Sequence, residues 1–424
     1  MRNRKSRILI AIILLCASLS KAQPFILPVD SLIRIITTES YRSHFDSIRT
    51  LPTNFRKVMP GKQQSADHDA CRDYVLRTFQ KNLGNENCYL HRFESGSYGG
   101  LANVVGVKLG NNKEKGIWIV SAHYDSNNNN QANYSKIDIS PGANDNGTGI
   151  AALLEIASVL RNIDTEATVI LVAWDMEEIF TDGYGTGSNK WFQEFVKRKP
   201  PTNWNDIGNR GNINRNDIQG NINFDMFGNP QTFDDGKPVL WACYAKDNQQ
   251  YFTQDYAKTV NQYIPEIKAV SYGRLIWSDH YTFAAQKIPS VENLESNYLN
   301  DPYYHTYSDH SQNADNIDFK FAANVTKGGL AFLLENILKV NKRANGAKSD
   351  FICKSETANY YCFETNSANA YVQIYSQFGK LINEEEQQSF FFNPPADGLY
   401  YIKINDEKGY RKQIIYLHKK EGLF

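Results

Sequence analysis

The chain has 424 residues, more than one average domain, and this length predicts a large domain accompanied by a smaller one. Hydrophobic residues make up 41% and aromatic residues 13% of the chain, which excludes a wholly disordered protein. Lys plus Arg and Asp plus Glu both number 46. The resulting formal charge of zero argues against nucleic acid or an anionic membrane as the main partner.

The N-terminus has the pattern of a secretory signal peptide. Four basic residues within 2–7 precede a short apolar run at 8–15, and the segment 20–22 (Ser-Lys-Ala) supplies small residues for cleavage. The apolar run is short for a bilayer span, which disfavours the alternative of an uncleaved anchor. We therefore predict a signal peptide over 1–22 and a mature protein without a membrane span that is secreted, periplasmic or on the cell surface.

Five cysteines follow the predicted cleavage point, and none belongs to a C-x-x-C pair. In an oxidising compartment Cys353 and Cys362 are expected to form a disulfide across a hairpin, and Cys71 with Cys88 is a second candidate pair. The absence of C-x-x-C argues against zinc held by sulfur. Any metal would therefore use nitrogen and oxygen ligands.

From about residue 66 onward, apolar helical patterns alternate with short β-branched runs. The predicted helices cover 66–83, 149–160, 192–197, 248–263 and 317–340. The predicted strands cover 103–109, 116–122, 168–174, 221–224 and 238–244. Apolar strands alternating with amphipathic helices predict an α/β domain over 23–343, with a mostly parallel sheet covered on both faces. Two Asn-rich stretches, 127–140 and 202–220, are predicted to be surface loops.

Helical periodicity ends near residue 344. Short alternating strands at 371–375, 400–404 and 412–417, separated by turn residues, predict a small β-sandwich over 344–424. This segment resembles a type IX secretion sorting domain of gliding-type bacteria, which would make secretion machinery a partner and the source bacterial. A generic appended β-sandwich is the alternative.

Polar residues follow three of the predicted strands, where open α/β sheets place their functional groups. Adjacent carboxylates at a buried strand end repel each other unless a cation or a proton compensates them. These residues are His123 and Asp125 after the second strand, Glu177 and Glu178 after the third, and Asp225 after the fourth.

Two further candidates precede helices. Asp145 lies in a glycine-containing segment before the helix at 149–160, and by itself it is typical of a helix cap. His305 lies in a Tyr-rich segment ahead of the last predicted helix. Neither position identifies a function alone.

In combination and in this order, the segments resemble the co-catalytic zinc aminopeptidases of the bacterial leucyl aminopeptidase type, a family that also contains glutaminyl cyclases. The resemblance covers about residues 60–340. The matching motifs are H-x-D at 123–125, G-A-x-D-N-x-x-G at 142–149, E-E at 177–178, S-D-H-x-x-F at 278–283, N-x-D-M at 223–226 and Y-H-T-x-x-D at 304–309.

The resemblance implies a secreted di-zinc metallo-exopeptidase, an aminopeptidase that hydrolyses N-terminal residues from peptides with a free N-terminus. It implies Glu177 as the general base and Asp125 as the residue that orients the first ligand. No G-x-S-x-G segment supplies a serine nucleophile. The implied ligands are His123 and Asp225 for one zinc ion, Glu178 and His305 for the other, and Asp145 as the bridge.

Two alternatives remain within the same fold: a glutaminyl-peptide cyclotransferase with one zinc ion, and a catalytically inactive binding relative. Cyclases resemble D-S after the bridging aspartate and W-H at the last ligand, whereas this chain has Asp145-Asn146 and Tyr304-His305. The stretch 179–186 is longer than the family's usual spacing, and Met176 replaces a common glycine. These departures leave the substrate preference open.

Overall fold

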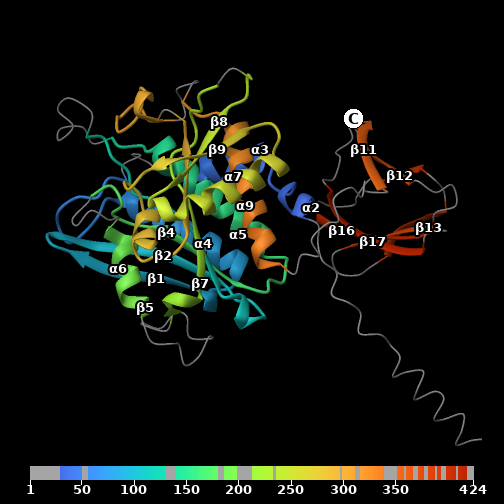
Figure 1. Cartoon of the computed structure of the whole chain (residues 1–424), viewed down its shortest axis with the longest axis horizontal. Coiled ribbons are helices and arrows are strands. Elements are labelled where there is room, and N and C mark those ends of the chain that lie inside the picture. Colours follow the sequence, from blue (N-terminus) through green and yellow to red (C-terminus); the bar gives the residue numbers. More distant parts are fainter. Residues whose placement is uncertain are drawn as a thin grey trace, which may run out of the picture. The chain divides into compact units, whose positions relative to one another are not determined.

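The computed structural model divides the chain into two compact units, of which the larger comprises Val29–Lys339 (Figure 1). The predicted signal peptide at 1–22 and the predicted domain boundary at 344 lie outside the described residues. The structure describes residues 29–49, 56–129, 139–179, 186–197, 213–232, 235–296, 298–310, 316–338, 351–357, 360–365, 371–376, 381–386, 389–392, 398–406 and 409–417.

The larger unit is built on an eight-stranded sheet with the order β1-β2-β4-β3-β7-β10-β8-β9. The four central strands β4, β3, β7 and β10 run parallel, while β1, β2 and β8 contribute antiparallel pairs. The predicted mostly parallel sheet is therefore confirmed. The strands are β1 (Cys88–Ser95), β2 (Tyr98–Lys108), β3 (Ile117–His123), β4 (Thr168–Trp174), β7 (Ile218–Phe224), β8 (Val239–Tyr244), β9 (Lys268–Arg274) and β10 (Ser290–Glu295).

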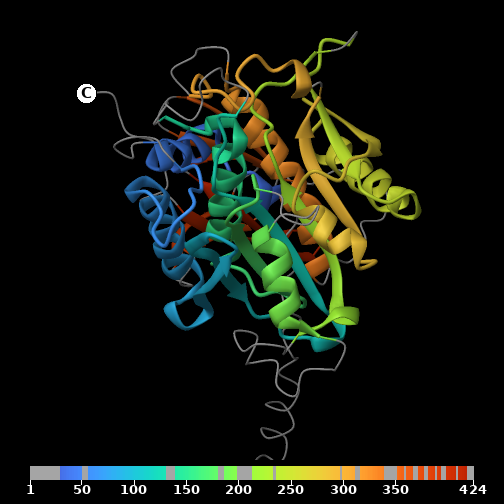
Figure 2. The ribbon, with the colours of Figure 1, turned by 90° about the vertical axis from the view of Figure 1, so that its left-hand side faces the viewer.

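Helices cover both faces of this sheet, as expected for parallel strands buried on both sides. α6 and α8 pack on one face, where Trp191, Phe192 and Phe283 join the core. α4, α5, α7 and α9 lie on the other; Figure 2 shows the green α6 and the orange α9 on different sides of the strands. The helices are α2 (Val29–Ile33), α3 (Thr38–Arg49), α4 (Ala66–Leu83), α5 (Thr148–Leu160), α6 (Thr186–Phe195), α7 (Gln250–Tyr263), α8 (His280–Ala285) and α9 (Phe319–Ile337).

Several predicted elements need correction. The helix expected to reach residue 197 ends at Phe195, because Val196–Lys197 form strand β5 and pair with β6 (Ile213–Asn214). β6 and the start of β7 also occupy part of the predicted surface loop 202–220. The other Asn-rich stretch starts buried: Asn127 is 8% exposed. Within the described residues, no helix is long and apolar enough to cross a membrane.

The predicted disulfide between Cys71 and Cys88 is wrong, since both cysteines are free thiols. Cys71 is buried on α4, and twelve further helical residues carry the chain about 18 Å away before β1 begins with Cys88. A disulfide needs Cα atoms roughly 4–7 Å apart. A residue count alone does not reveal that a helix separates the two positions.

The C-terminal strands form two antiparallel sheets, in agreement with the all-β segment that the sequence predicts. The backbone register places Cys353 opposite Phe363 and Lys354 opposite Cys362. The side chains of the two cysteines lie outside the described residues, so their disulfide stays a prediction. The strands are β11 (Phe351–Thr357), β12 (Tyr360–Thr365), β15 (Ser389–Phe392) in one sheet, and β14 (Leu381–Glu386), β13 (Tyr371–Ser376), β16 (Gly398–Asp406), β17 (Gly409–Leu417) in the other.

Candidate metal centre

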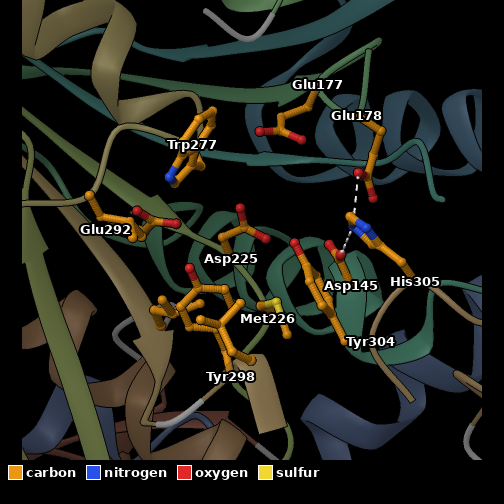
Figure 3. Close-up of a pocket in the computed structure, with 13 residues that line it drawn as sticks. Asp145, Glu177, Glu178, Asp225, Met226, Trp277, Glu292, Tyr298, Tyr304 and His305 are labelled. Carbon is orange, nitrogen blue, oxygen red and sulfur yellow. Dashed lines mark ion pairs between the residues drawn. The ribbon is translucent and has the colours of Figure 1, made fainter. Parts of the chain in front are cut away.

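The candidate ligands meet at the carboxyl ends of the central parallel strands, where the sequence predicts a site. His123 is the last residue of β3, and Asp225 directly follows β7. Glu178 lies four residues beyond the end of β4. Asp145 comes from the turn Ala143–Gly147 ahead of α5, and His305 from the segment after β10 (Figure 3).

The Asp145 carboxylate lies between the two histidines. Its Oδ1 is 3.2 Å from Nε2 of His123, and its Oδ2 is 3.1 Å from Nε2 of His305. On the first side Asp225 Oδ1 lies 3.2 Å from the His123 nitrogen. On the second side Glu178 Oε2 lies 3.0 Å from the His305 nitrogen. The structure thus brings all five predicted ligands together, in two groups that share Asp145.

This donor set fits zinc. Ligand atoms of a tetrahedral zinc ion with bonds of about 2.0–2.1 Å lie about 3.3 Å apart, close to the observed contacts. Glu177 and Glu178 each have one buried carboxylate oxygen without a hydrogen-bond partner, which is costly unless a cation compensates it. Nitrogen and oxygen donors without thiolate also suit zinc. The ligand atoms of His123, Asp145 and Glu178 lie within 4.8 Å of one another.

The protein supplies little positive charge to these carboxylates. Burial, assisted by the Asp145 carboxylate, raises the pKa of Glu178 to about 7. Burial also raises the pKa of Glu177 above its ordinary value. For His305, burial lowers the pKa, but the Glu178 and Asp145 carboxylates outweigh it and raise the pKa to about 11. These shifts indicate a centre that is short of cations.

Asp125 lies behind His123, as predicted, and also holds the carboxylate pair. The His123 Nδ1 atom is 3.4 Å from Asp125 Oδ1 and 3.2 Å from the Asp125 carbonyl oxygen. The two carboxylate oxygens of Asp125 accept hydrogen bonds from the amides of Glu177, at 3.0 Å, and Glu178, at 3.1 Å. One carboxylate therefore fixes both a ligand and the segment that carries the candidate base.

The last predicted motif orients Asp145. Asp309 accepts hydrogen bonds from the backbone amides of Asn144, at 2.8 Å, and Asp145, at 3.1 Å. The peptide bond between Asp145 and Asn146 is cis. The final aspartate of the Y-H-T-x-x-D motif thus holds the turn from which the shared carboxylate projects.

Met176 occupies a backbone conformation that glycine adopts more readily. Its φ is 57°, in the left-handed region, which explains why a glycine is common at this position in the family that the sequence resembles. The Met176 side chain is fully buried against Val58 and Leu101. Burial of this side chain offsets the conformational cost and keeps the following glutamates in place.

Sequence reasoning missed a buried network just before the glutamate pair. His68 Nε2 lies 2.8 Å from Asp175 Oδ1, and Tyr124 donates its hydroxyl proton to Asp175 Oδ2, also at 2.8 Å. His68 is buried on α4, and a histidine on the apolar face of this predicted helix is the sequence signal that could have indicated a buried polar partner. Asn127 was missed as well: its side-chain amide donates to Glu178 Oε2 at 3.2 Å.

The His68–Asp175 pair predicts a pH-dependent stability. Burial lowers the pKa of His68, but the Asp175 carboxylate outweighs it and raises the pKa to about 9. Because folding raises this pKa, the stability that the His68–Asp175 pair contributes is complete below about pH 6.5, the pKa of histidine in the unfolded chain. It is lost as the pH rises towards 9. We expect the free energy of unfolding, relative to His68→Gln, to fall by roughly 3 kcal/mol over that window.

Urea denaturation of the metal-free protein, with chelator present throughout, measures this difference. Asp175→Asn is the matched control, because it removes the partner and should abolish the same pH dependence. Identical pH profiles for the wild type and His68→Gln would contradict the assignment of a charged pair.

A pocket of about 330 Å³ opens beside the centre. It is lined on one side by Asp145, Glu177, Glu178, Asp225 and His305. The remaining lining residues are Met226, Leu275, Trp277, Glu292, Leu294, Tyr298, Leu299 and Tyr304.

Comparison with known proteins places the chain in a metallopeptidase class. The model of peptidase family M28 matches residues 103–328, more than half of the sequence. The chain therefore belongs to peptidase family M28.

Individual relatives are distant or partial. The chain is similar to aminopeptidase YwaD of Bacillus subtilis, with 37% identity over 78 residues, or 18% of this chain and only 15% of that protein. The solved structure of the Legionella pneumophila LapA aminopeptidase has a TM-score of 0.53 at 18% identity, covering 72% of this chain and 74% of that one. The solved structure of Tannerella forsythia glutaminyl cyclase also has a TM-score of 0.53, at 17% identity, covering 72% of this chain and 99% of that one. The fold alone therefore does not separate the two activities.

Proposed function

We propose that this chain is an exported, di-zinc aminopeptidase that hydrolyses N-terminal residues from peptides. The observation that carries the proposal is the position of Asp145, whose two carboxylate oxygens each face a different histidine. A carboxylate with one oxygen in each ligand group is what two neighbouring ions require of a bridge. Besides Asp145, each group has a histidine and a second carboxylate, which also supports two ions over one.

Glu177 is the proposed general base. Its carboxylate is 3% exposed and its Oε2 lies 4.0 Å from His123 Nε2, so it borders the ligands without belonging to either group. Its Oε1 has no hydrogen-bond partner. When bound, the zinc pair supplies Lewis acidity for a water molecule and for the peptide carbonyl. Glu177 takes the proton of that water and passes it to the nitrogen of the leaving amine.

The pocket accounts for exopeptidase action in this proposal. Its volume of about 330 Å³ is near the lower limit for ligand pockets, enough for one amino-acid side chain. A zinc ion bound at its metal-facing side would offer a coordination position to the neutral α-amine of a free N-terminus. Peptides with a blocked N-terminus should therefore be poor substrates.

The second candidate function is cyclisation of N-terminal glutamine, which the fold likeness to the Tannerella cyclase supports. That reaction releases ammonia from the substrate and no amino acid. In this chain Asn146 follows Asp145 and Tyr304 precedes His305, where cyclases resemble D-S and W-H. These two departures from the cyclase pattern favour the peptidase.

A panel of aminoacyl-arylamides, with glutaminyl-arylamide included, tests the proposal. We expect the zinc-loaded protein to release free amino acids, a strong chelator to reduce the rate to background, and added zinc to restore it. Mass spectrometry of the native protein should count two zinc ions per chain. Full activity without metal would end the di-zinc proposal, and pyroglutamate formation without hydrolysis would establish the cyclase instead.

A further inference from the structure

The pocket beside the metal centre has an apolar, aromatic wall. Met226 and Leu294 pack with the buried Cys243, and Leu275 and Tyr298 lie against this cluster. At the rim, Trp277 is 62% exposed and Leu299 is 72% exposed. Such a wall suits the methylene groups of a substrate side chain.

Glu292 is the exception in this wall. It lies on the central strand β10, is 2% exposed, and pairs in register with Asn223 of β7 and Cys243 of β8. In Figure 3 its carboxylate points into the space between Trp277 and Tyr298. Glu292 belongs to none of the predicted motifs, and β10 was not among the predicted strands, because only two of its six residues are apolar.

His280 contacts Glu292 without neutralising it. The His280 Nδ1 atom lies 3.1 Å from Glu292 Oε2, while Nε2 donates its proton to the Leu275 carbonyl oxygen at 3.0 Å. Burial lowers the pKa of His280 to about 4, so the ring is neutral and its Nδ1 lone pair can only accept a proton that Glu292 holds. Burial, with the nearby Asp225 carboxylate, raises the pKa of Glu292. Buried acids without a cation are rare because their desolvation is costly.

The rest of the lining favours a cation as the missing partner. Of the five acids that line the pocket, four belong to the metal centre, where bound zinc would compensate them, and Glu292 stands apart from that centre; the lining contains neither a lysine nor an arginine. The rings of Trp277, Tyr298 and Tyr304 line the same space, and aromatic faces attract cations. An aliphatic substrate side chain would leave Glu292 protonated and uncharged, whereas an ammonium or guanidinium group would stabilise its carboxylate form.

We propose that this pocket selects N-terminal lysine or arginine, and that Glu292 is the residue that determines this specificity. The methylene groups of such a side chain would lie on the apolar wall, and its charged end would meet the Glu292 carboxylate in a charge-assisted hydrogen bond. The proposal rests on the proposed aminopeptidase function and names its substrate class.

Lysyl- and norleucyl-arylamides test this directly, because the two side chains share their aliphatic stem and differ in the terminal ammonium. We expect the wild type to favour lysine over norleucine in kcat/KM by about tenfold to a hundredfold. Glu292→Gln should reduce this ratio by about tenfold or more, and Glu292→Leu should reverse it. Glu266→Gln, at an exposed position, is the matched control and should keep the wild-type ratio.

The outcomes separate this proposal from the proposed function. A wild type that prefers norleucine, or a Glu292→Gln variant that loses both substrates equally with unchanged zinc content, would overturn the specificity role. Absence of hydrolysis for every arylamide would contradict the aminopeptidase and not the pocket. In that case calorimetric titration of the zinc-loaded protein with free L-lysine and L-norleucine decides: tighter binding of lysine supports the proposal, and equal binding rejects it.

Discussion

Glu177→Gln is expected to lower kcat by about 10²- to 10⁴-fold while two zinc ions remain bound. The substitution keeps the shape and the hydrogen-bonding capacity of the side chain but removes its ability to accept a proton. Because Glu177 stands beside both ligand groups, at 4.0 Å from the nearer histidine nitrogen, metal binding should persist.

The measurement is kcat together with zinc content for the same preparation. Glu94→Gln, an exposed change of the same chemistry on β1, is the matched control and should behave as the wild type. A near wild-type kcat in Glu177→Gln would remove the residue from its role as base. Loss of zinc with loss of activity would instead make Glu177 a ligand.

Asp145→Ala is expected to reduce the zinc content from two ions per chain to none. Each of its carboxylate oxygens contacts a different histidine, so a single truncation removes a ligand from both groups. Asp225→Ala and Glu178→Ala provide the comparison, because each disrupts only one group and should leave one ion bound. Metal analysis after gel filtration measures all three variants.

An outcome in which Asp145→Ala retains one ion would show that the carboxylate serves only one group. Denaturation curves of the metal-free proteins test whether a variant loses zinc only because it has unfolded. Each metal-free variant should still unfold in one cooperative transition, so that loss of zinc cannot be attributed to loss of the fold.

The convergence of the five candidate ligands could be predicted from the sequence because they follow buried strands or lie in short motifs of fixed spacing. Strand β4 was predicted with its observed bounds, and a run of six apolar residues after Thr168, all buried, leaves little ambiguity. Strand β9 was missed because it lies at the edge of the sheet and alternates exposed residues with partly buried ones.

Contacts between segments that are distant in the chain could not be predicted. His68 and Asp175 are separated by 107 positions, and only the packing of α4 against the sheet brings them together. Glu292 lies on β10, a strand that was not predicted, and the pocket that it lines is formed by segments far apart in the chain. The second role of Asp125, as acceptor for two backbone amides, likewise depends on how the chain turns after β4.

The contacts that Asp125 makes with His123 and with two backbone amides have a consequence for how two zinc ions would bind. An ion that settles on His123 also immobilises Asp125, and through the two amide hydrogen bonds it orders the segment that carries Glu178. Binding of a second ion then costs less conformational entropy, because the segment that carries its ligand Glu178 is already ordered. We therefore expect positive cooperativity in zinc titrations, and Asp125→Asn should flatten it by weakening the shared anchor.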